Sequence, residues 1–439
     1  MSVHRGYQPR TAWSIAVLIT CLALINFLDK IVLGMVAVPL MAELKLDPST
    51  FGLLAGSFFW LFSLSSIALS FLANRYPTRW ILLGLAVSWS VLQIPLTYAA
   101  SAFTILLCRL ILGVAEGPSA AISAHALFKW FPDERRSLPM ALVNQGGVVG
   151  LVLAGLLIPQ VSKHWGWRMN FVLLAGLGAA WCLLWLRFGR EGSIADRPGP
   201  AGTYHAQPGS GDISGEPQPR VAYRHILGTP SVLAIFLLGF SAYWSVALIL
   251  TWLPTYLEKG LGFDAITSGR LFAVILLLTA PYTFALSWLS ERMLARGAPS
   301  RKARVGVLNW AFLFGGTLLC SLALLDMQAA VKVVVLGVAT CLPSICFGFA
   351  PAILGGLVPT SQRSAVMGVY VAVATSAGAI APALVGRLVQ AHGSLNARGY
   401  ELGFAIGGAL LIIAAVLSAR YLHPDRARQS LRAATAEVA

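Results

Sequence analysis

Charged side chains are scarce in this sequence. Asp, Glu, Lys and Arg make up 11% of its 439 residues, whereas apolar residues make up 57%. A soluble domain carries about a quarter charged residues, so this composition excludes an ordinary soluble enzyme or binding module. Acidic residues are the scarcer kind. The net charge of +15 is what basic loops on one side of a membrane produce, so it does not indicate nucleic-acid binding.

The sequence also lacks the usual signatures of catalysis and of bound cofactors. Its six cysteines lie in apolar runs without the spacing of metal ligands, so we interpret them as packing residues. The glycine-rich segments 113–117 and 146–147 have no preceding strand and no following Lys-Ser or Lys-Thr pair, which a phosphate-binding loop requires. We expect no enzyme activity, no cofactor and no metal.

Long apolar runs recur along the whole chain instead. Many of them reach the length of roughly 20 residues that a membrane-spanning helix needs. The strands of a barrel would alternate apolar and polar residues, so we predict an all-α polytopic membrane protein with twelve transmembrane helices. The predicted spans are 13–38, 50–73, 80–99, 103–128, 138–161, 167–188, 230–257, 268–291, 304–325, 331–358, 364–390 and 399–422.

A polar stretch rich in Gly, Pro and Ser divides these spans into two equal sets. We predict an N-terminal six-helix bundle, a linker, a C-terminal six-helix bundle and a tail, at 1–189, 190–228, 229–424 and 425–439. The segment 131–140 shares Pro, Arg, Ser and Met at identical spacing with 358–367. Such a repeat indicates two pseudo-symmetric bundles with a site between them, near the middle of the membrane.

Positive charge sets the predicted orientation. Most of the 32 Lys and Arg residues lie in one set of predicted loops, together with both ends of the chain. Because positively charged loops stay on the cytoplasmic side, we predict that both termini and the linker are cytoplasmic. We expect a multi-pass protein of the plasma membrane, which in a bacterium is the inner membrane.

Charged residues lie deep inside the first and fourth predicted spans, at Asp29, Lys30, Arg109 and Glu116. Charge at membrane depth costs about 2.5–3.5 kcal/mol for each residue, so these positions are candidates for function. Asp29 and Arg109 have nearly the same predicted depth, so we expect them to pair, with Glu116 one to two turns deeper. Such carboxylates can take up and release a proton as their neighbours move. The alternative is a static salt bridge between the two helices.

The plan of two six-helix halves, with Asn74 to Arg79 between the second and third spans, resembles the major facilitator superfamily. That family's loop carries an aspartate and a glycine where this sequence has Asn74 and Pro77. Further segments are similar to the anion:cation symporter branch: Asn-Phe-Leu-Asp-Lys at 26–30, Glu-Gly-Pro at 116–118, Trp-Phe-Pro-Asp-Glu-Arg at 130–135 and Thr-Trp-Leu-Pro-Thr-Tyr-Leu at 251–257.

The resemblance implies transport by alternating access, with proton coupling at Asp29 and Glu116, and we expect Arg109 to take part as their charge partner. It also implies that Lys30, where the branch usually has arginine, holds the carboxylate of the substrate. We expect Arg109 to contribute to substrate binding as a second positive charge. Lys30 lies about 100° round its helix from Asp29, so it can face a cavity while Asp29 faces the fourth helix. The alternative for Lys30 is that it snorkels to the periplasmic surface.

Other candidates come from polar and aromatic residues on the predicted spans. Those for the substrate cavity are Asn144, Gln145, Tyr243 and Tyr370. Each of them can either line a cavity or pack against a neighbouring helix. A cytoplasmic gate is expected at Arg75, Arg79, Glu134 and Arg135. The alternative is that these are ordinary charges of cytoplasmic loops.

These features favour proton-coupled uptake of a small organic anion, such as a carboxylate or a sugar acid, by a monomer in the lipid bilayer. The alternative is a proton-driven exporter of a drug or metabolite, although Lys30 and Arg109 favour an anion over a cationic drug. A channel would need rings of polar pore-lining groups or a carbonyl filter. Phe27 and Phe62, with Trp60 nearby, stand where sugar-acid members of the branch often carry tyrosines, which favours a less hydroxylated, even aromatic, carboxylate.

Overall fold

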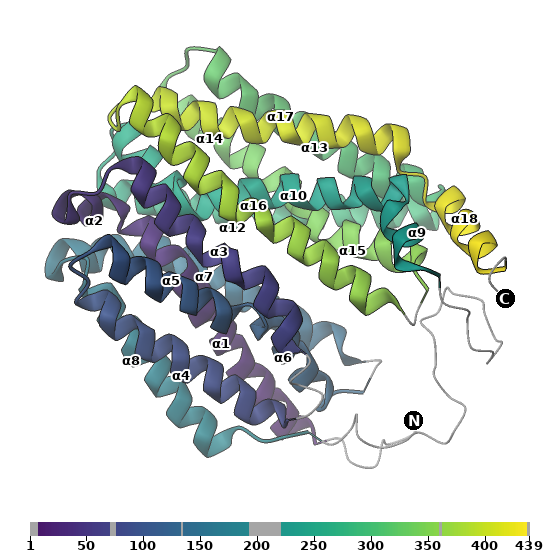
Figure 1. Cartoon of the computed structure of the whole chain (residues 1–439), viewed down its shortest axis with the longest axis horizontal. Helices are drawn as coiled ribbons and strands as arrows, with labels where there is room; N and C mark the ends of the chain where they lie inside the picture. Colours follow the sequence, from purple (N-terminus) through teal and green to yellow (C-terminus); the bar gives the residue numbers. More distant parts are fainter. Residues whose placement is uncertain (1–7, 71–75, 133–134, 193–220, 360–361, 437–439) are drawn as a thin grey trace.

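A computed structural model describes residues 8–70, 76–132, 135–192, 221–359 and 362–436. Twelve helical segments of this part of the chain are long and apolar enough to cross a membrane. All regular secondary structure in the described ranges is helical, which confirms the predicted all-α polytopic fold. The helices form two bundles, with α1 to α8 in one and α9 to α18 in the other (Figure 1).

The N-terminal bundle follows the predicted spans closely, with one interruption. The fourth span is divided after Glu116, because Pro118 has no N–H with which to continue the helical hydrogen bonds. The helices are α1 (Pro9–Met35), α2 (Ala37–Leu44), α3 (Pro48–Ser70), α4 (Thr78–Thr97), α5 (Ala102–Glu116), α6 (Ser119–Phe128), α7 (Ser137–Trp165) and α8 (Met169–Phe188).

The C-terminal bundle contains two spans that are interrupted near prolines, Pro254 and Pro343. Its helices are α9 (Tyr223–Gly228), α10 (Pro230–Thr251), α11 (Leu253–Thr255), η3 (Tyr256–Gly260), α12 (Ala265–Ala295), η4 (Arg301–Gly306), α13 (Val307–Leu324), α14 (Ala329–Cys341), η5 (Leu342–Ile345), α15 (Cys346–Leu357), α16 (Arg363–His392), α17 (Ala397–Tyr421) and α18 (Pro424–Ala436). Of the expected linker, residues 193–220 lie outside the described residues.

The two bundles contact each other mainly where α3 runs along α16 and α7 runs along α12 (Figure 1). Glycines allow the close approach that such crossings need. A β-carbon on Gly56 would lie 2.9 Å from the carbonyl oxygen of Ala379, and one on Gly155 would lie 2.6 Å from that of Gly269.

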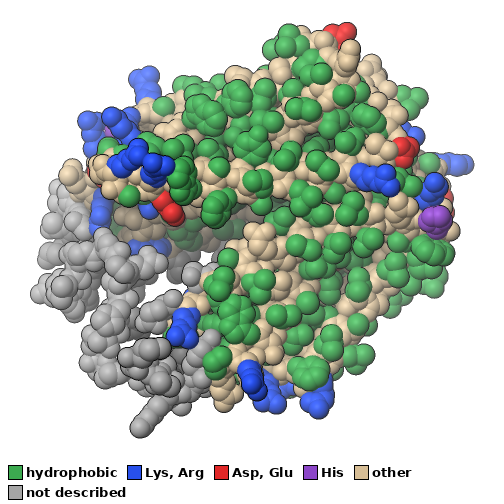
Figure 2. Space-filling view, turned by 180° about the vertical axis from the view of Figure 1, so that it is seen from behind, with side chains coloured by type: hydrophobic (Ala, Val, Ile, Leu, Met, Phe, Trp, Pro, Cys, Tyr) green, Lys and Arg blue, Asp and Glu red, His purple; other side chains and the backbone are tan. Residues whose placement is uncertain are grey.

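The ends of the bundles that are remote from the chain termini are the ends held together. The first turns of α3 meet the last turns of α16 there, and the Phe51 and Trp252 ring centroids lie 5.3 Å apart across the interface. On the side of the chain ends, Figure 2 shows a hollow between the two bundles. The same view shows apolar side chains over the outer surface and Lys and Arg near its ends, as expected for helices that face lipid.

Candidate functional site

A hydrogen-bonded network joins α1 to α5 in the middle of the N-terminal bundle. The Lys30 Nζ atom donates to Asn26 Oδ1 at 2.6 Å, and Asn26 Nδ2 donates to Glu116 Oε2 at 2.7 Å. Lys30 Nζ also lies 3.6 Å from Glu116 Oε2, which makes an ion pair. The Glu116 side chain is 0% exposed and that of Lys30 is 11% exposed, so water screens this pair weakly.

Local helix geometry explains why these residues meet. Asn26 and Lys30 are four residues apart on α1, so their side chains project from the same face of the helix. Asn26 therefore bridges the ammonium and the carboxylate. Sequence analysis assigned no role to Asn26, although its four-residue spacing from Lys30 was visible.

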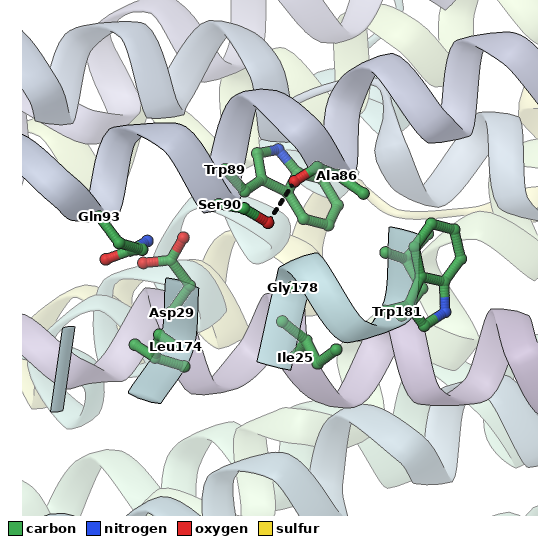
Figure 3. Close-up of a pocket in the computed structure, with 10 residues that line it drawn as sticks. Ile25, Asp29, Ala86, Trp89, Ser90, Gln93, Leu174, Gly178 and Trp181 are labelled. Atoms are coloured by element: carbon green, nitrogen blue, oxygen red, sulfur yellow. Dashed lines mark hydrogen bonds between the residues drawn. The ribbon is translucent and has the colours of Figure 1, made fainter. Parts of the chain in front are cut away.

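The expected pair of Asp29 and Arg109 was wrong. Among the described residues, no ion pair within 4.0 Å joins them, and their opposite charges interact only at longer range. Asp29 instead points towards Gln93 of α4 (Figure 3). The predicted depths placed the two α-carbons at one level, but depth along a helix does not fix the direction of a side chain. Lys30, and not Asp29, is the α1 residue that pairs with the span formed by α5 and α6.

Arg109 lies inside the bundle with 3% exposure. Its guanidinium carbon is 4.5 Å from the centroid of the Phe58 ring on α3, a cation–π distance. Its Nε atom has no hydrogen-bond partner among the described residues. Arg109 therefore places a positive charge close to the Asp29 and Glu116 carboxylates, but it forms no ion pair within 4.0 Å with either of them.

Aromatic rings surround the Lys30 ammonium. Its Nζ atom lies 4.7 Å from the Phe27 centroid and 5.3 Å from the Phe62 centroid. Both rings are partly buried. Trp60, which is 47% exposed, lies on the opposite side of α3 from Phe62, since two residues rotate a helix by about 200°.

The aromatic contacts continue from α3 into the C-terminal bundle. Phe59 has its ring centroid 6.0 Å from that of Phe62 and 5.7 Å from that of Tyr243 on α10. Tyr243 in turn lies 6.2 Å from Phe347 of α15, which is 40% exposed. The predicted cavity residue Tyr243 thus sits at the junction of the two bundles, one ring away from the Lys30 site.

The other predicted cavity residues lie on α7 and α16. Asn144 is exposed on the same face of α7 as Gly155, which packs against Gly269 of the other bundle. Gln145 is exposed on a different face, with the outward-facing Val149. Tyr370 is 4% exposed and packs against Gly239 inside the C-terminal bundle.

The expected gate is described only in part. Arg75 and Glu134 lie outside the described residues. Arg79 donates from Nη2 to the carbonyl oxygen of Leu186 at 3.0 Å. Arg135 is exposed, just before α7. Arg79 therefore ties α4 to α8 within one bundle.

Glu191 is a residue that sequence analysis missed. Its carboxylate accepts hydrogen bonds from the backbone N–H groups of Thr78 and Arg79 at 3.1 and 2.9 Å, at the N-terminus of α4. It also accepts one from Lys129 at 2.6 Å. Burial raises the pKa of Glu191, but the bonds from Lys129, Arg79 and Thr78 outweigh burial and hold the pKa below its ordinary value. It lies in a polar stretch after α8, where no local pattern distinguishes it.

Comparison with known proteins identifies relatives along most of the chain. The family model of the Major Facilitator Superfamily matches residues 19–351. The hexuronate transporter of Bacillus subtilis is 24% identical, over 91% of this chain and 92% of that protein. The D-galactonate transporter of Escherichia coli O6:H1 is 22% identical, over 94% of this chain and 97% of that protein.

Plant relatives match over a shorter part of their own length. The chloroplastic ascorbate transporter of Arabidopsis thaliana is 28% identical, over 68% of this chain and 57% of that protein. The chain thus matches only about half to three fifths of the length of such chloroplastic relatives. The proteins named in these comparisons are transporters and not enzymes.

Solved structures share the fold. A bacterial homologue of the human lysosomal transporter Spinster, in an inward-facing and unoccupied conformation, superposes with a TM-score of 0.76 at 18% identity, covering 97% of this chain and 99% of that one. A D-xylose–proton symporter superposes with a TM-score of 0.72 at 14% identity, covering 94% and 99%.

Proposed function

The chain belongs to the major facilitator superfamily, and we propose that it is a secondary transporter that takes up a small organic carboxylate together with protons. The proposal is carried by the network of Lys30, Asn26 and Glu116. The relatives named for transport of hexuronate and D-galactonate support an organic anion as the substrate.

The network supplies a coupling mechanism. A deprotonated Glu116 and a substrate carboxylate compete for one ammonium group, that of Lys30. When Glu116 takes up a proton, it loses its negative charge, and Lys30 becomes available to the substrate. Proton and substrate therefore bind together, and neither moves efficiently alone. Arg109, held at the Phe58 ring without an ion-pair partner among the described residues, adds positive charge to the same region.

Alternating access uses the two bundles as the moving parts. Neutralising the buried Glu116 and Lys30 charges lowers the cost of moving them past the apolar rings beside them. The glycine contacts at Gly56 and Gly155 hold one end of the bundles together and separate when that end opens. With the termini on the cytoplasmic side, as the positive charge of the loops favours, the hollow in Figure 2 opens to the cytoplasm.

The surroundings of Lys30 favour a carboxylate with a flat or apolar body. Besides Asn26 and Glu116, the Phe27 and Phe62 rings lie close to its ammonium. A phenyl ring cannot hydrogen-bond to the hydroxyl groups of a sugar acid. We assign Asn144 and Tyr243 to the wall of the substrate path, and we keep Gln145 and Tyr370 as weaker candidates for it, because one faces outward and the other packs within its bundle.

The proposal also covers the cytoplasmic gate, the oligomeric state and Asp29. Arg79 and Arg135, with Arg75 and Glu134, form the cytoplasmic gate. The chain acts as a monomer in a plasma membrane. Asp29 contributes to proton coupling from its own position on α1.

The test is uptake into proteoliposomes. A panel of radiolabelled carboxylates is offered with an inward proton gradient, with an outward gradient and with none. Accumulation above the outside concentration only with the inward gradient supports proton-coupled uptake. Accumulation driven by the outward gradient supports the exporter instead, and accumulation without either gradient excludes proton coupling.

A further inference from the structure

A large cavity lies between the two bundles at the end of the molecule that is remote from the chain termini. Its volume is about 410 Å³, within the range of about 300–1,000 Å³ that is typical of small-molecule sites. The N-terminal bundle lines it with the end of α1, with α2 and with the end of α7, and the C-terminal bundle lines it with α11, η3 and the start of α12. Neither Lys30 nor Glu116 lines it, so it is separate from the site described above.

Three polar side chains of this cavity lack a close partner among the described residues. Ser268 on α12 is only 3% exposed, yet its Oγ atom makes no hydrogen bond. The Glu258 carboxylate on η3 and the Lys163 ammonium on α7 form no ion pair within 4.0 Å in the described ranges. Asp264 differs from them, because its carboxylate caps the N-terminus of α12. Buried polar atoms without partners are rare, so the Ser268 hydroxyl indicates that something else binds here.

Lys163 and Glu258 bring opposite charges to the cavity from opposite bundles. Burial raises the pKa of the Glu258 carboxyl group, and the positive charge of Lys259 does not offset this effect. A cation in the cavity would therefore stabilise the carboxylate. Because the two charges do not pair with each other, a molecule with both an ammonium group and an anionic group can lie between them. The Ser268 hydroxyl can donate to the anionic group.

The cavity lies at the depth of lipid headgroups. Trp165, the last residue of α7, is 66% exposed, and exposed tryptophans gather at the membrane–water interface. Leu156 on α7 and Leu277 on α12, both exposed, lie deeper along the two helices, where the outer surface faces acyl chains. Leu156 is seven residues from Lys163, so the two side chains project from the same face of α7. A lipid can therefore place its headgroup in the cavity and its chains on this apolar surface.

We propose that this cavity binds the headgroup of an aminophospholipid, a lipid that carries a primary ammonium group and a phosphate, such as phosphatidylethanolamine. Glu258 binds the ammonium group, Lys163 binds the phosphate, and Ser268 donates to a phosphate oxygen. A free zwitterion shares this headgroup chemistry. The apolar surface beside the cavity favours the lipid, because only the lipid has acyl chains to cover it.

The bound lipid favours one conformation of the protein. The walls of the cavity come from both bundles, so they separate when this end of the molecule opens. The headgroup then loses either Lys163 or Glu258. Aminophospholipid should therefore stabilise the conformation described here, in which this end is closed. The site itself does not depend on the proposed substrate, and only its effect on transport rests on the proposed alternating access.

Native mass spectrometry of the full-length protein in detergent provides the test. The probes are phosphatidylethanolamine, phosphatidylcholine and soluble phosphoethanolamine. Three methyl groups remove every N–H donor from the choline headgroup, so we expect one phosphatidylethanolamine to bind more tightly than phosphatidylcholine. Glu258→Gln should erase this preference. Lys163→Gln should weaken both lipids by about three- to tenfold and keep the preference, because both carry the phosphate.

The matched controls are Asp326→Asn and Lys45→Gln, which remove exposed charges at the same end of the molecule without touching the lining of the cavity. They should change neither the affinity nor the preference. A preference that survives Glu258→Gln, or a loss in the controls equal to that in Lys163→Gln, would overturn the proposal, because the lipid would then respond only to overall charge. Phosphoethanolamine that binds as tightly as the lipid would overturn it in favour of a free solute.

Ser268→Ala separates binding from folding. Because the Oγ atom has no partner among the described residues, the melting temperature without lipid should not fall. The affinity for phosphatidylethanolamine should fall by about threefold, the effect of one hydrogen bond. A lower melting temperature with unchanged lipid affinity would contradict the contact between Ser268 and the phosphate. Lipid binding is measured without substrate, so a failure of proton-driven uptake would contradict the transport function and leave this site intact.

Discussion

The carboxylate of Glu116 lies 3.6 Å from the ammonium of Lys30, and Asn26 hydrogen-bonds to both groups. This pair crosses from α5 to α1 at the place where the Phe27 and Phe62 rings surround the lysine. Because of this contact, the protonation state of the Glu116 carboxyl group decides whether the Lys30 ammonium is paired or available to a substrate. A transporter needs such a link between an ion and a substrate.

The first prediction concerns the cation. Lys30→Gln removes the charge but keeps much of the side-chain length. Loss of one charged hydrogen-bond partner costs about 1.5–3 kcal/mol, so the apparent affinity for the best carboxylate should fall tenfold or more. Lys30→Arg should keep transport, with a change in the preferred acid, because its charge remains while its planar head differs. If both variants keep the affinity of the unmodified protein in proteoliposomes, Lys30 does not hold the substrate.

The second prediction separates true contacts from nearby charges. In a double-mutant cycle, Lys30→Met and Glu116→Gln should show a coupling energy of about 0.5–3 kcal/mol in thermal unfolding, because each single variant leaves the other group buried without its partner. The matched cycle of Asp29→Asn with Arg109→Met should couple more weakly, since no ion pair joins them. Stronger coupling in the second cycle would contradict the pairing described here.

The third prediction concerns the body of the substrate. With Phe27 and Phe62 beside the ammonium, benzoate-like acids should compete for uptake more strongly than gluconate-like acids. Phe62→Tyr, which adds a hydroxyl group to the ring, should move this preference towards the hydroxylated acids. Trp60→Phe is the control, because the Trp60 side chain lies on another side of α3 and is 47% exposed. A preference that stays with sugar acids in every variant would contradict the aromatic assignment but not anion transport.

The fourth prediction concerns stability and pH. The pKa of Glu191 lies below its ordinary value, so its contribution to stability is complete above the unfolded-state pKa of about 4.3 and is lost as pH falls through the folded-state pKa. Glu191→Gln should lower stability at neutral pH by about 1 kcal/mol, a value reduced for its 27% exposure. The variant should then lose less stability than the unmodified protein on acidification. Glu291→Gln, at an exposed glutamate of α12, should change neither quantity.

The spans could be predicted from the sequence because the length and apolar character of each run are local properties. Even the division at Pro118 follows from local chemistry, although the apolar run continues across it. The positions of Asp29, Lys30, Arg109 and Glu116 inside the membrane were equally visible. The partners of these four side chains could not be predicted, because the depth of an α-carbon does not reveal which neighbouring helix its side chain contacts.

The direction of each side chain depends on packing between helices. The Asp29 side chain points towards α4, a helix that was not compared in depth with α1. Its position next to Gln93 was therefore not predicted. Lys30 met Glu116 because Asn26 holds both in place. Glu191 joins segments more than 60 residues apart in sequence, so no local pattern could identify it.

The most direct test of the account is the transport behaviour of Glu116→Gln in proteoliposomes. A glutamine cannot exchange a proton, and it leaves Lys30 permanently available. We therefore predict that an inward proton gradient drives far less accumulation, while exchange of labelled for unlabelled substrate across the membrane persists. Accumulation against a gradient at the level of the unmodified protein would contradict the account, because the proton would then be carried elsewhere than on Glu116.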